Sequence, residues 1–287
     1  MRPARRGLLR DGRATFGLSV LALAAVVAVL APLIAGDPLL QRDIVATRFL
    51  PPFSSDLHGQ FHLLGTDRFG RDVWARLVFG ARISLTVGAL AVLVSGAVGV
   101  AVGAIAGFWR GWPGVLLLGF TDFALALPRV VLLLLLASLW QPSAALVVLV
   151  LGLTGWMTIA RLVHGEVRTL AVRPFVEGAI GLGAGGPRVL TRHILPNALT
   201  PVIVASALGL GNAIMLEAGL SFLGLGVQPP TPSWGNLIAS GRDTLVNAPW
   251  VAAAPGVALV LVVVAATLLG DAVRDRWDPS AAQRGLG

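Results

Sequence analysis

Long apolar segments with almost no charge recur along the whole sequence and constrain its fold more than any other feature. The hydrocarbon core of a bilayer is about 30 Å thick, and an α-helix needs roughly 20 apolar residues to cross it. Six segments have about this length or more: residues 15–35, 81–108, 115–140, 143–160, 200–220 and 250–270. None shows the strict alternation of a membrane β-barrel strand. The sequence therefore predicts an all-α integral membrane protein with six transmembrane helices.

Composition supports this class and excludes several others. Of the 287 residues, 56% are hydrophobic and only 13% are charged, whereas soluble domains carry about 25% charge. The chain has no cysteine, so a disulfide framework and a cysteine-ligated metal centre are both excluded. It also has no lysine, because all 22 basic residues are arginine. A phosphate-binding loop of the Walker type requires that lysine, so we expect no nucleotide hydrolysis by this chain.

The positions of the arginines predict the orientation in the membrane. Cytoplasmic loops of membrane proteins are enriched in basic residues. With the N-terminus inside, fourteen arginines fall in inner segments and seven in outer ones. Both termini are therefore expected in the cytoplasm, and the sequence pI of 11.7 reflects topology rather than nucleic-acid binding. A cleaved signal peptide is the alternative for the arginine-rich start, but residues 15–35 outlast an ordinary signal and further spans follow.

These expectations divide the chain into consecutive parts. They are a cytoplasmic tail (1–14), a first transmembrane helix (15–35), an extracytoplasmic loop (36–80), a core with five transmembrane helices (81–271) that includes a cytoplasmic loop (161–199), and a cytoplasmic tail (272–287). The third span contains Asp122, Pro128 and Arg129 and is expected to break near its inner end. We expect Asp122 at the membrane edge and an Arg129 side chain extended inward.

A glycine stripe lies on the second span. Gly99, Gly103 and Gly107 recur every four residues and therefore share one face of the helix. Small residues at this spacing allow two helix backbones to approach closely. Helix packing is the expected role, in preference to lining a path for a substrate.

The cytoplasmic loop contains a short helix with recognisable ends. Pro174 suits a first helical position, Glu177 suits the first turns, and Gly183 suits a helix stop. The spacing predicts a helix over residues 174–182. Four apolar residues are expected on one of its sides: Phe175, Val176, Ala179 and Leu182. Such a helix lies on the lipid surface or docks in a groove of a partner protein.

This loop resembles the EAA loop of ABC importer permeases. The resemblance rests on the pattern Glu-x-Ala-x-x-x-Gly followed by Ile-Leu-Pro, carried by Glu177, Ala179, Gly183, Ile194, Leu195 and Pro196. The sequence departs from the family at Gly178, where alanine is usual, and at Ile180 and Gly181. Two glycines within the helix weaken it by about 1 kcal/mol each relative to alanine. The resemblance implies that this helix couples the chain to an ATPase subunit.

Two further segments narrow the resemblance to permeases of dipeptide, oligopeptide and nickel importers. The first precedes the second span and includes Gly65, Thr66, Asp67, Gly70, Arg71 and Asp72. The second follows Glu217 and includes Ser221, Phe222, Leu223 and Gly224. Residues 270–279 are similar to the C-terminal end of the same permeases, and the lone first span is typical of their "C" subunit.

The residue types of the segment 66–76 also predict its local structure, independently of the resemblance. Thr66 or Asp67 can cap a helix that begins near Arg68. Asp67 and Arg71, Arg68 and Asp72, and Asp72 and Arg76 then fall four positions apart and can pair. A surface helix on the outer membrane face is therefore expected, in preference to direct contact with a substrate.

Two other candidates remain open in the sequence. Glu217 lies within the fifth span, and a carboxylate there is costly unless it is paired or faces a cavity. It belongs either to a structural pair, for example with Arg82, or to the translocation path. His58 and His62 stand four residues apart, but without a third ligand we expect no metal site.

The resemblance implies a type I ABC importer permease that moves peptides or a similar small solute. It implies a second permease subunit, forming a heterodimer, two ATPase subunits that use ATP and magnesium, and an extracytoplasmic solute-binding protein. The chain itself is expected to bind membrane lipid but no cofactor, metal or nucleic acid, and to catalyse no reaction. The alternatives are a permease for nickel, sugar or phosphonate, a secondary transporter with inverted repeats, and a membrane enzyme, for which no nucleophile or metal cluster is present.

Overall fold

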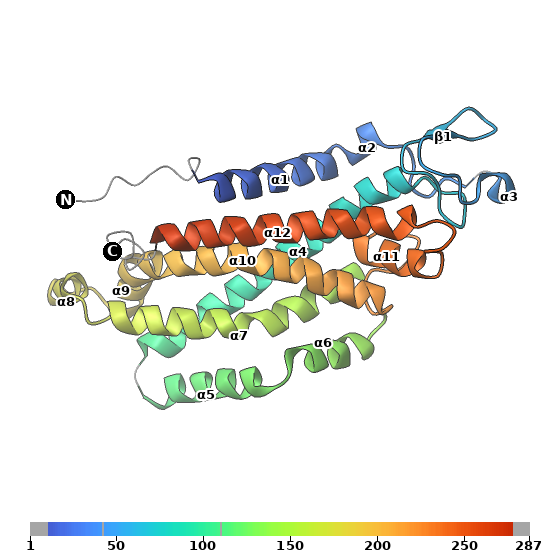
Figure 1. Cartoon of the computed structure of the whole chain (residues 1–287). Helices are drawn as coiled ribbons and strands as arrows, with labels where there is room; N and C mark the ends of the chain where they lie inside the picture. Colours follow the sequence, from blue (N-terminus) through green and yellow to red (C-terminus); the bar gives the residue numbers. More distant parts are fainter. Residues whose placement is uncertain (1–10, 42, 110, 278–287) are drawn as a thin grey trace, which may run out of the picture.

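The computed structural model describes residues 11–41, 43–109 and 111–277 and is almost entirely helical (Figure 1). Residues 1–10 and 278–287 of the two expected tails lie outside the described residues. The helices are α1 (Gly12–Val29), α2 (Ala31–Ile34), α3 (Ile44–Thr47), α4 (Val73–Phe108), α5 (Trp112–Ala126), α6 (Arg129–Ser138), α7 (Ala144–Leu170), α8 (Pro174–Gly181), α9 (Gly186–Val189), the π-helical turn η2 (Leu190–Ile194), α10 (Leu195–Phe222), α11 (Trp234–Arg242) and α12 (Trp250–Trp277). Strands β1 (Ser54–Ser55) and β2 (Phe61–His62) form an antiparallel hairpin in which Ser54 pairs with His62.

The described residues contain five helices that are long and apolar enough to cross a membrane, and six spans if the bent pair α5–α6 is counted as one broken span. This confirms the predicted all-α membrane fold. The two halves of the third span meet at an angle of 89°. The break falls at residues 127–128, midway along the span rather than near its inner end, because Pro128 removes a backbone donor and disfavours helix in the residue before it.

Several spans extend beyond their predicted limits, and the last, α12, ends at Trp277 rather than at 270. Helix α4 begins at Val73 rather than near 81, because the Asp72 carboxylate caps it by accepting a hydrogen bond from Ala75 N at 2.8 Å. Helix α7 continues to Leu170, ten residues into the expected loop 161–199, and the chain leaves it shortly before Pro174. Helix α10 starts at Leu195 rather than at 200. Hydropathy marks the part of a helix that lies in lipid, whereas caps and prolines decide where the helix ends.

The core of the bundle is the contact between α4 and α7, and the glycine stripe lies in it. A Cβ at Gly99 would lie 2.7 Å from the Trp156 carbonyl oxygen, and one at Gly107 would lie 3.0 Å from that of His164. Such distances leave no room for a side chain, so the stripe serves helix packing as expected. Helix α10 packs against α4, α7 and α12, and α1 packs against α12 and α4.

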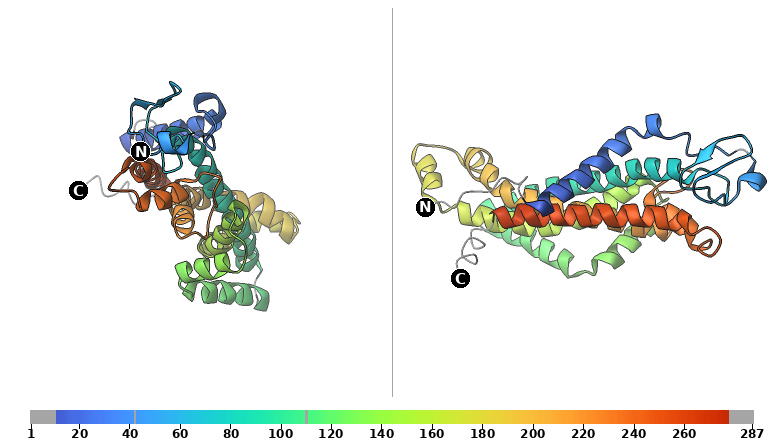
Figure 2. Two further views of the ribbon diagram at one scale, coloured as in Figure 1. Left: turned by 90° about the vertical axis from the view of Figure 1, so that its right-hand side faces the viewer. Right: turned by 45° about the horizontal axis from the view of Figure 1, so that its top comes forward.

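The bundle has two distinct ends (Figure 1). At one end lie α8, the start of α1 and the end of α12. At the other end lie the β-hairpin, α3 and α11. Helices α5 and α6 lie at one side of the bundle, and the views in Figure 2 place them away from α1 and α12. Their outward residues are large and apolar, for example Phe120, Phe123 and Val131, as expected for a surface in contact with lipid or another membrane subunit.

Candidate functional site

Helix α8 has the ends that the sequence predicts. Pro174 occupies its first turn, and Glu177 lies in the first turn as well. Gly183 has a φ of +86°, the left-handed conformation that glycine adopts without strain. Its N–H donates to the Ile180 carbonyl at 2.9 Å, and the N–H of Ala184 donates to the Ala179 carbonyl at 3.0 Å. These two bonds form a Schellman motif, so the stop at Gly183 is built into the local sequence.

Most of α8 faces away from the rest of the chain. Only Val176 is buried, at 1% exposure, whereas Leu182 is 91% exposed and Phe175 and Ile180 are also exposed. The expected apolar side is therefore only partly correct, because Val176 points inward while Phe175 and Leu182 remain open. Glu177 is exposed too, and a Cβ at Gly178 or Gly181 would meet nothing within 4 Å. The helix thus presents a mixed acidic and apolar surface attached through one buried side chain.

The Ile194-Leu195-Pro196 segment joins α8 to the long helix α10. Pro196 lies in the first turn of α10, directly after the π-helical turn η2. Proline has no backbone N–H to donate, which suits the first turn of a helix. Just before it, the Leu195 N–H donates to the Leu190 carbonyl and closes the π-helical turn. Ile194 is fully buried and packs in one apolar cluster with Val176. This part of the motif anchors α8 to the bundle.

The segment before α4 folds into a closed turn, so the expected surface helix is wrong. The Asp67 N–H donates to the Arg71 carbonyl at 3.0 Å, and a β-bridge joins Thr66 to Asp72. Gly65 and Gly70 both have positive φ, of +71° and +72°. A turn of two glycines in this conformation cannot be a helix, and the expected pairing of Arg68 with Asp72 does not form among the described residues.

The Asp67 carboxylate is the centre of this turn. It accepts hydrogen bonds from the backbone N–H groups of Phe69 at 2.8 Å and Arg71 at 3.0 Å. It also forms a salt bridge with the Arg71 guanidinium at 2.7 Å, and the Arg76 Nε lies 3.8 Å away. All three ionic side chains are at most 9% exposed. Thr66, also buried, donates to the Thr47 carbonyl and ties the turn to α3. These residues hold the outer segment together.

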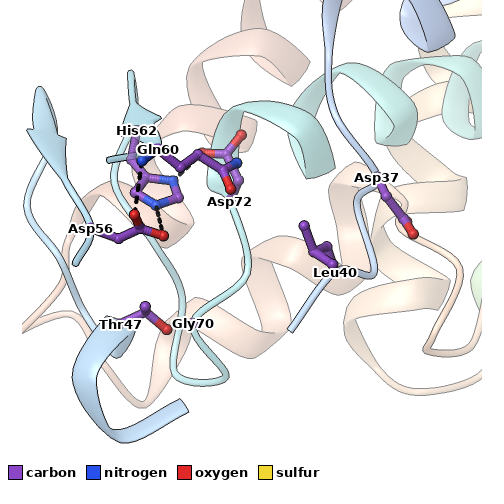
Figure 3. A pocket seen from close by; sticks show the side chains of 8 residues that line it. All are labelled: Asp37, Leu40, Thr47, Asp56, Gln60, His62, Gly70 and Asp72. Atoms are coloured by element: carbon purple, nitrogen blue, oxygen red, sulfur yellow. Dashed lines mark hydrogen bonds and ion pairs between the residues drawn. The ribbon is translucent and has the colours of Figure 1, made fainter. Parts of the chain in front are cut away.

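His62 lies between two carboxylates in the same region (Figure 3). Its Nδ1 is 3.0 Å from Asp72, and its Nε2 is 3.8 Å from Asp56. Burial raises the pKa of Asp56, but the N–H groups of Gln60 and His58 and the charge of His62 outweigh it and hold the pKa below its ordinary value. His58 is exposed and sits in the hairpin loop rather than on a helix. Within the described residues no group of three His, Cys, Asp or Glu side chains could hold a metal ion.

Glu217 is fully buried in a cluster of serine hydroxyls that joins three helices. Ser84 of α4 donates to its Oε2 at 2.8 Å, and Ser221 of α10 donates to its Oε1 at 2.7 Å. The Ser84 Oγ in turn accepts a bond at 3.2 Å from the backbone N–H of Trp234, the first residue of α11. Arg82 is exposed, so the suggested pair between Arg82 and Glu217 is wrong. Serines, rather than an arginine, satisfy this carboxylate.

The segment after α10 supplies the third helix of this cluster. The Ser221 Oγ accepts a bond from Val227 N at 2.9 Å, and Gly224 has a φ of +77° that turns the chain back. Phe222 and Leu223 are exposed. Helix α11 was not predicted, although Ser233 and Asn236 form a capping box at its start. The Ser-x-x-Asn spacing was the available signal, and the short length of α11 hid it from a search for apolar spans.

A bundle of apolar helices with an exposed short helix at one end defines the chain as an integral membrane protein. The chain belongs to the family of binding-protein-dependent transport system inner membrane components, whose profile matches residues 99–283. It is therefore a permease subunit of an ABC importer.

Similar proteins agree with this assignment. A putative peptide permease protein of Brucella suis is 43% identical over 222 residues, which are 77% of this chain and 74% of that protein. A putative peptide transport system permease protein of Brucella abortus is 37% identical over 98% of this chain and 92% of its own length. The dipeptide transport system permease protein DppC of Alkalihalophilus pseudofirmus is 34% identical over 97% of this chain and 89% of its own length.

Proposed function

We propose that this permease moves peptides or similar small solutes across the cytoplasmic membrane and that α8 is its contact with an ATPase subunit. The observation that carries the proposal is the surface of α8, where Glu177 and three large apolar side chains are exposed around one buried anchor, Val176. A monomeric soluble surface rarely exposes such a set unless a partner covers it. The names of the similar proteins support peptides as the cargo.

The assembly follows from this role. Two ATPase subunits bind and hydrolyse ATP with magnesium, and this chain contributes no phosphate-binding loop because it has no lysine with which to build one. A solute-binding protein docks at the opposite end, where the hairpin and α11 lie, and a second permease subunit completes a heterodimer. In this arrangement both termini and the α8 end face the cytoplasm, and the chain performs no catalysis of its own.

The coupling step uses the anchor of α8. When the ATPases close on ATP, they displace α8 together with Val176. Val176 packs in a cluster that includes Val163 of α7 and Ala198 of α10. A close-packed cluster transmits displacement rather than absorbing it, so α7 and α10 shift and the bundle rocks between outward and inward openings.

Substitutions within α8 test this proposal. Gly183→Val places a β-branched residue at a φ of +86° and costs at least about 1–2 kcal/mol of local stability. Glu177→Lys puts a positive charge at the positive end of the helix. In the complete importer, both variants should insert normally, but peptide uptake and co-purification of the ATPases should fall.

Gly178→Ala is the matched control in the same helix. A Cβ at this position meets nothing within 4 Å, and alanine favours helix by about 1 kcal/mol, so uptake should be retained. If Gly183→Val and Glu177→Lys behave like this control in both uptake and ATPase association, α8 is not the coupling element.

A further inference from the structure

A cavity of about 180 Å³ lies inside the bundle, between α4, α6, α7 and α10. It is separate from α8, from the Asp67 turn and from the Glu217 cluster. Much of its lining is polar, although it is formed by apolar spans. The polar lining side chains are Ser95, Arg129, Thr158, Ser206 and Asn212.

Arg129 gives this cavity a positive charge without a counter-charge. Its buried Nε has no hydrogen-bond partner, and no described residue forms an ion pair with it. The nearest acid along the chain, Asp122, pairs with Arg161 at 3.3 Å instead, and no acidic residue lines the cavity. Arg129 was expected to extend toward the inner membrane surface, but its side chain lines the cavity.

Gly155 leaves the space that the guanidinium uses. A Cβ at Gly155 would contact the Ser95 Oγ and would lie 3.3 Å from the Arg129 Nη2. The guanidinium therefore lies against the backbone of α7, close to the Ser95 hydroxyl.

The broken span adds to the positive potential. Helix α6 begins at Arg129 itself, after the 89° bend, and no side chain caps its first N–H groups. The N-terminus of a helix carries roughly half a positive charge. In transporters, half-helices that start within the membrane direct this end at anionic groups of the substrate. An unpaired charge within the membrane is costly unless it serves such a purpose.

We propose that this cavity is an anion subsite of the translocation path, in which Arg129 and the N-terminus of α6 bind the carboxylate of the cargo. Ser206, Thr158 and Asn212 supply hydrogen bonds to the neighbouring polar groups of the solute. The identification of the anion as a peptide carboxylate rests on the proposed function, whereas the preference for an anion rests on the cavity alone.

The preference for an anion can be measured without knowledge of the cargo. The chain has no cysteine, so Ser206→Cys places a single thiol in the cavity wall. In the complete importer, its rates of reaction with an anionic and a cationic methanethiosulfonate reagent of similar size are compared by mass spectrometry. Arg129→Gln should lower the anionic-to-cationic rate ratio at least about fivefold, and Arg129→Lys should lower it less.

Val246→Cys serves as the control, because Val246 is 96% exposed in the loop between α11 and α12, outside the spans. Its rate ratio should not respond to Arg129→Gln. An equal ratio at Ser206→Cys with Arg129 present and replaced overturns the anion subsite. If Arg129→Gln fails to assemble, the test uses Ser206→Cys with Arg129 retained and measures protection of its thiol by added peptide. Trialanine should slow modification of the thiol, and trialanine amide should not. Equal rates with the two compounds overturn the subsite.

Transport separates this inference from the proposed function. In vesicles that contain the complete importer and its binding protein, Arg129→Gln should reduce uptake of trialanine about tenfold or more. If the importer takes up trialanine and Arg129→Gln has no effect, the subsite is wrong and the proposed function stands. If it takes up no peptide at all, the proposed cargo is wrong, and the thiol rate ratios still decide on the anion subsite.

Discussion

Removal of the Asp67 carboxylate should open the outer turn of the permease. The Asp67 side chain is 3% exposed and faces Arg71 and Arg76, whose side chains are 9% and 2% exposed. Asp67→Ala leaves both guanidinium groups buried without an anion. Breaking a buried ion pair from one side costs about 3–5 kcal/mol, mostly because the remaining charge is uncompensated. The backbone N–H groups of Phe69 and Arg71 lose their acceptor as well.

Hydrogen exchange measures this cost where it arises. A loss of about 3 kcal/mol in local stability accelerates exchange by more than about a hundredfold, since every 1.4 kcal/mol is a factor of ten. The relevant amides are those of residues 67–71, followed by mass spectrometry on the purified importer. Asp67→Asn keeps an acceptor for the two backbone groups but not the charge, so its exchange should lie between those of the native chain and Asp67→Ala.

Asp243→Ala is the control for loss of an aspartate. Asp243 pairs with Arg242 at 3.1 Å, but both side chains are 64% exposed, and such pairs contribute about 1 kcal/mol or less. If Asp67→Ala exchanges at residues 67–71 no faster than Asp243→Ala does, the burial argument for the Asp67 cluster is refuted.

Three further outcomes are expected. Cysteine at Leu182, which is 91% exposed, should react with an impermeant reagent only from the cytoplasm, and cysteine at Val246, which is 96% exposed, only from outside; labelling of intact cells and inverted vesicles checks both. Glu217→Ala should lower the free energy of unfolding of the complex by about 2–4 kcal/mol, because it leaves serine hydroxyls without a partner and creates a cavity. Glu217→Gln should lower it less, and thermal unfolding checks both. The pKa of Asp56 is held below its ordinary value, so its contribution to stability is present above the ordinary carboxyl pKa and is lost as the pH falls through the lowered one. Exchange in the β-hairpin should therefore accelerate below about pH 4, and Asp56→Asn should remove that step.

The labelling positions differ from those that the sequence suggests. Sites near Asp67 and Trp234 are expected outside the membrane, yet both residues are only 2% exposed. The hydropathy of a loop indicates on which side of the lipid it lies, but not how much of it folds on itself. The outer turn needs partners as distant as Thr47 and Trp250, whose Nε1 donates to the Thr66 carbonyl at 3.2 Å.

Local signals predicted local structure well. The spans, the interruption at Pro128 and the helix stop at Gly183 each depend on residues within one or two turns, and each is present in the structure. The partners of Glu217 could not be predicted in the same way. Ser84 lies 133 positions away in the chain, and only the packing of α4 against α10 brings it to the carboxylate. The place of Arg129 in a cavity could not be predicted either, because residues of four separate helices line that cavity.

The Glu217 cluster, the Arg129 cavity and the apolar cluster around Val176 lie one after another along α10. Near one end, the Glu217 cluster fixes α10 to α4 and α11 through serine hydrogen bonds. At the other end, α10 joins the apolar cluster that also holds Val176 of α8. Ile159 belongs to that cluster and lines the Arg129 cavity as well, so the packing is continuous from α8 to the cavity. Because the proposed coupling through α8 would push one end of α10 while the other end is tied, we expect the change in shape to be greatest between them, where Ser206, Asn212 and Arg129 line the cavity.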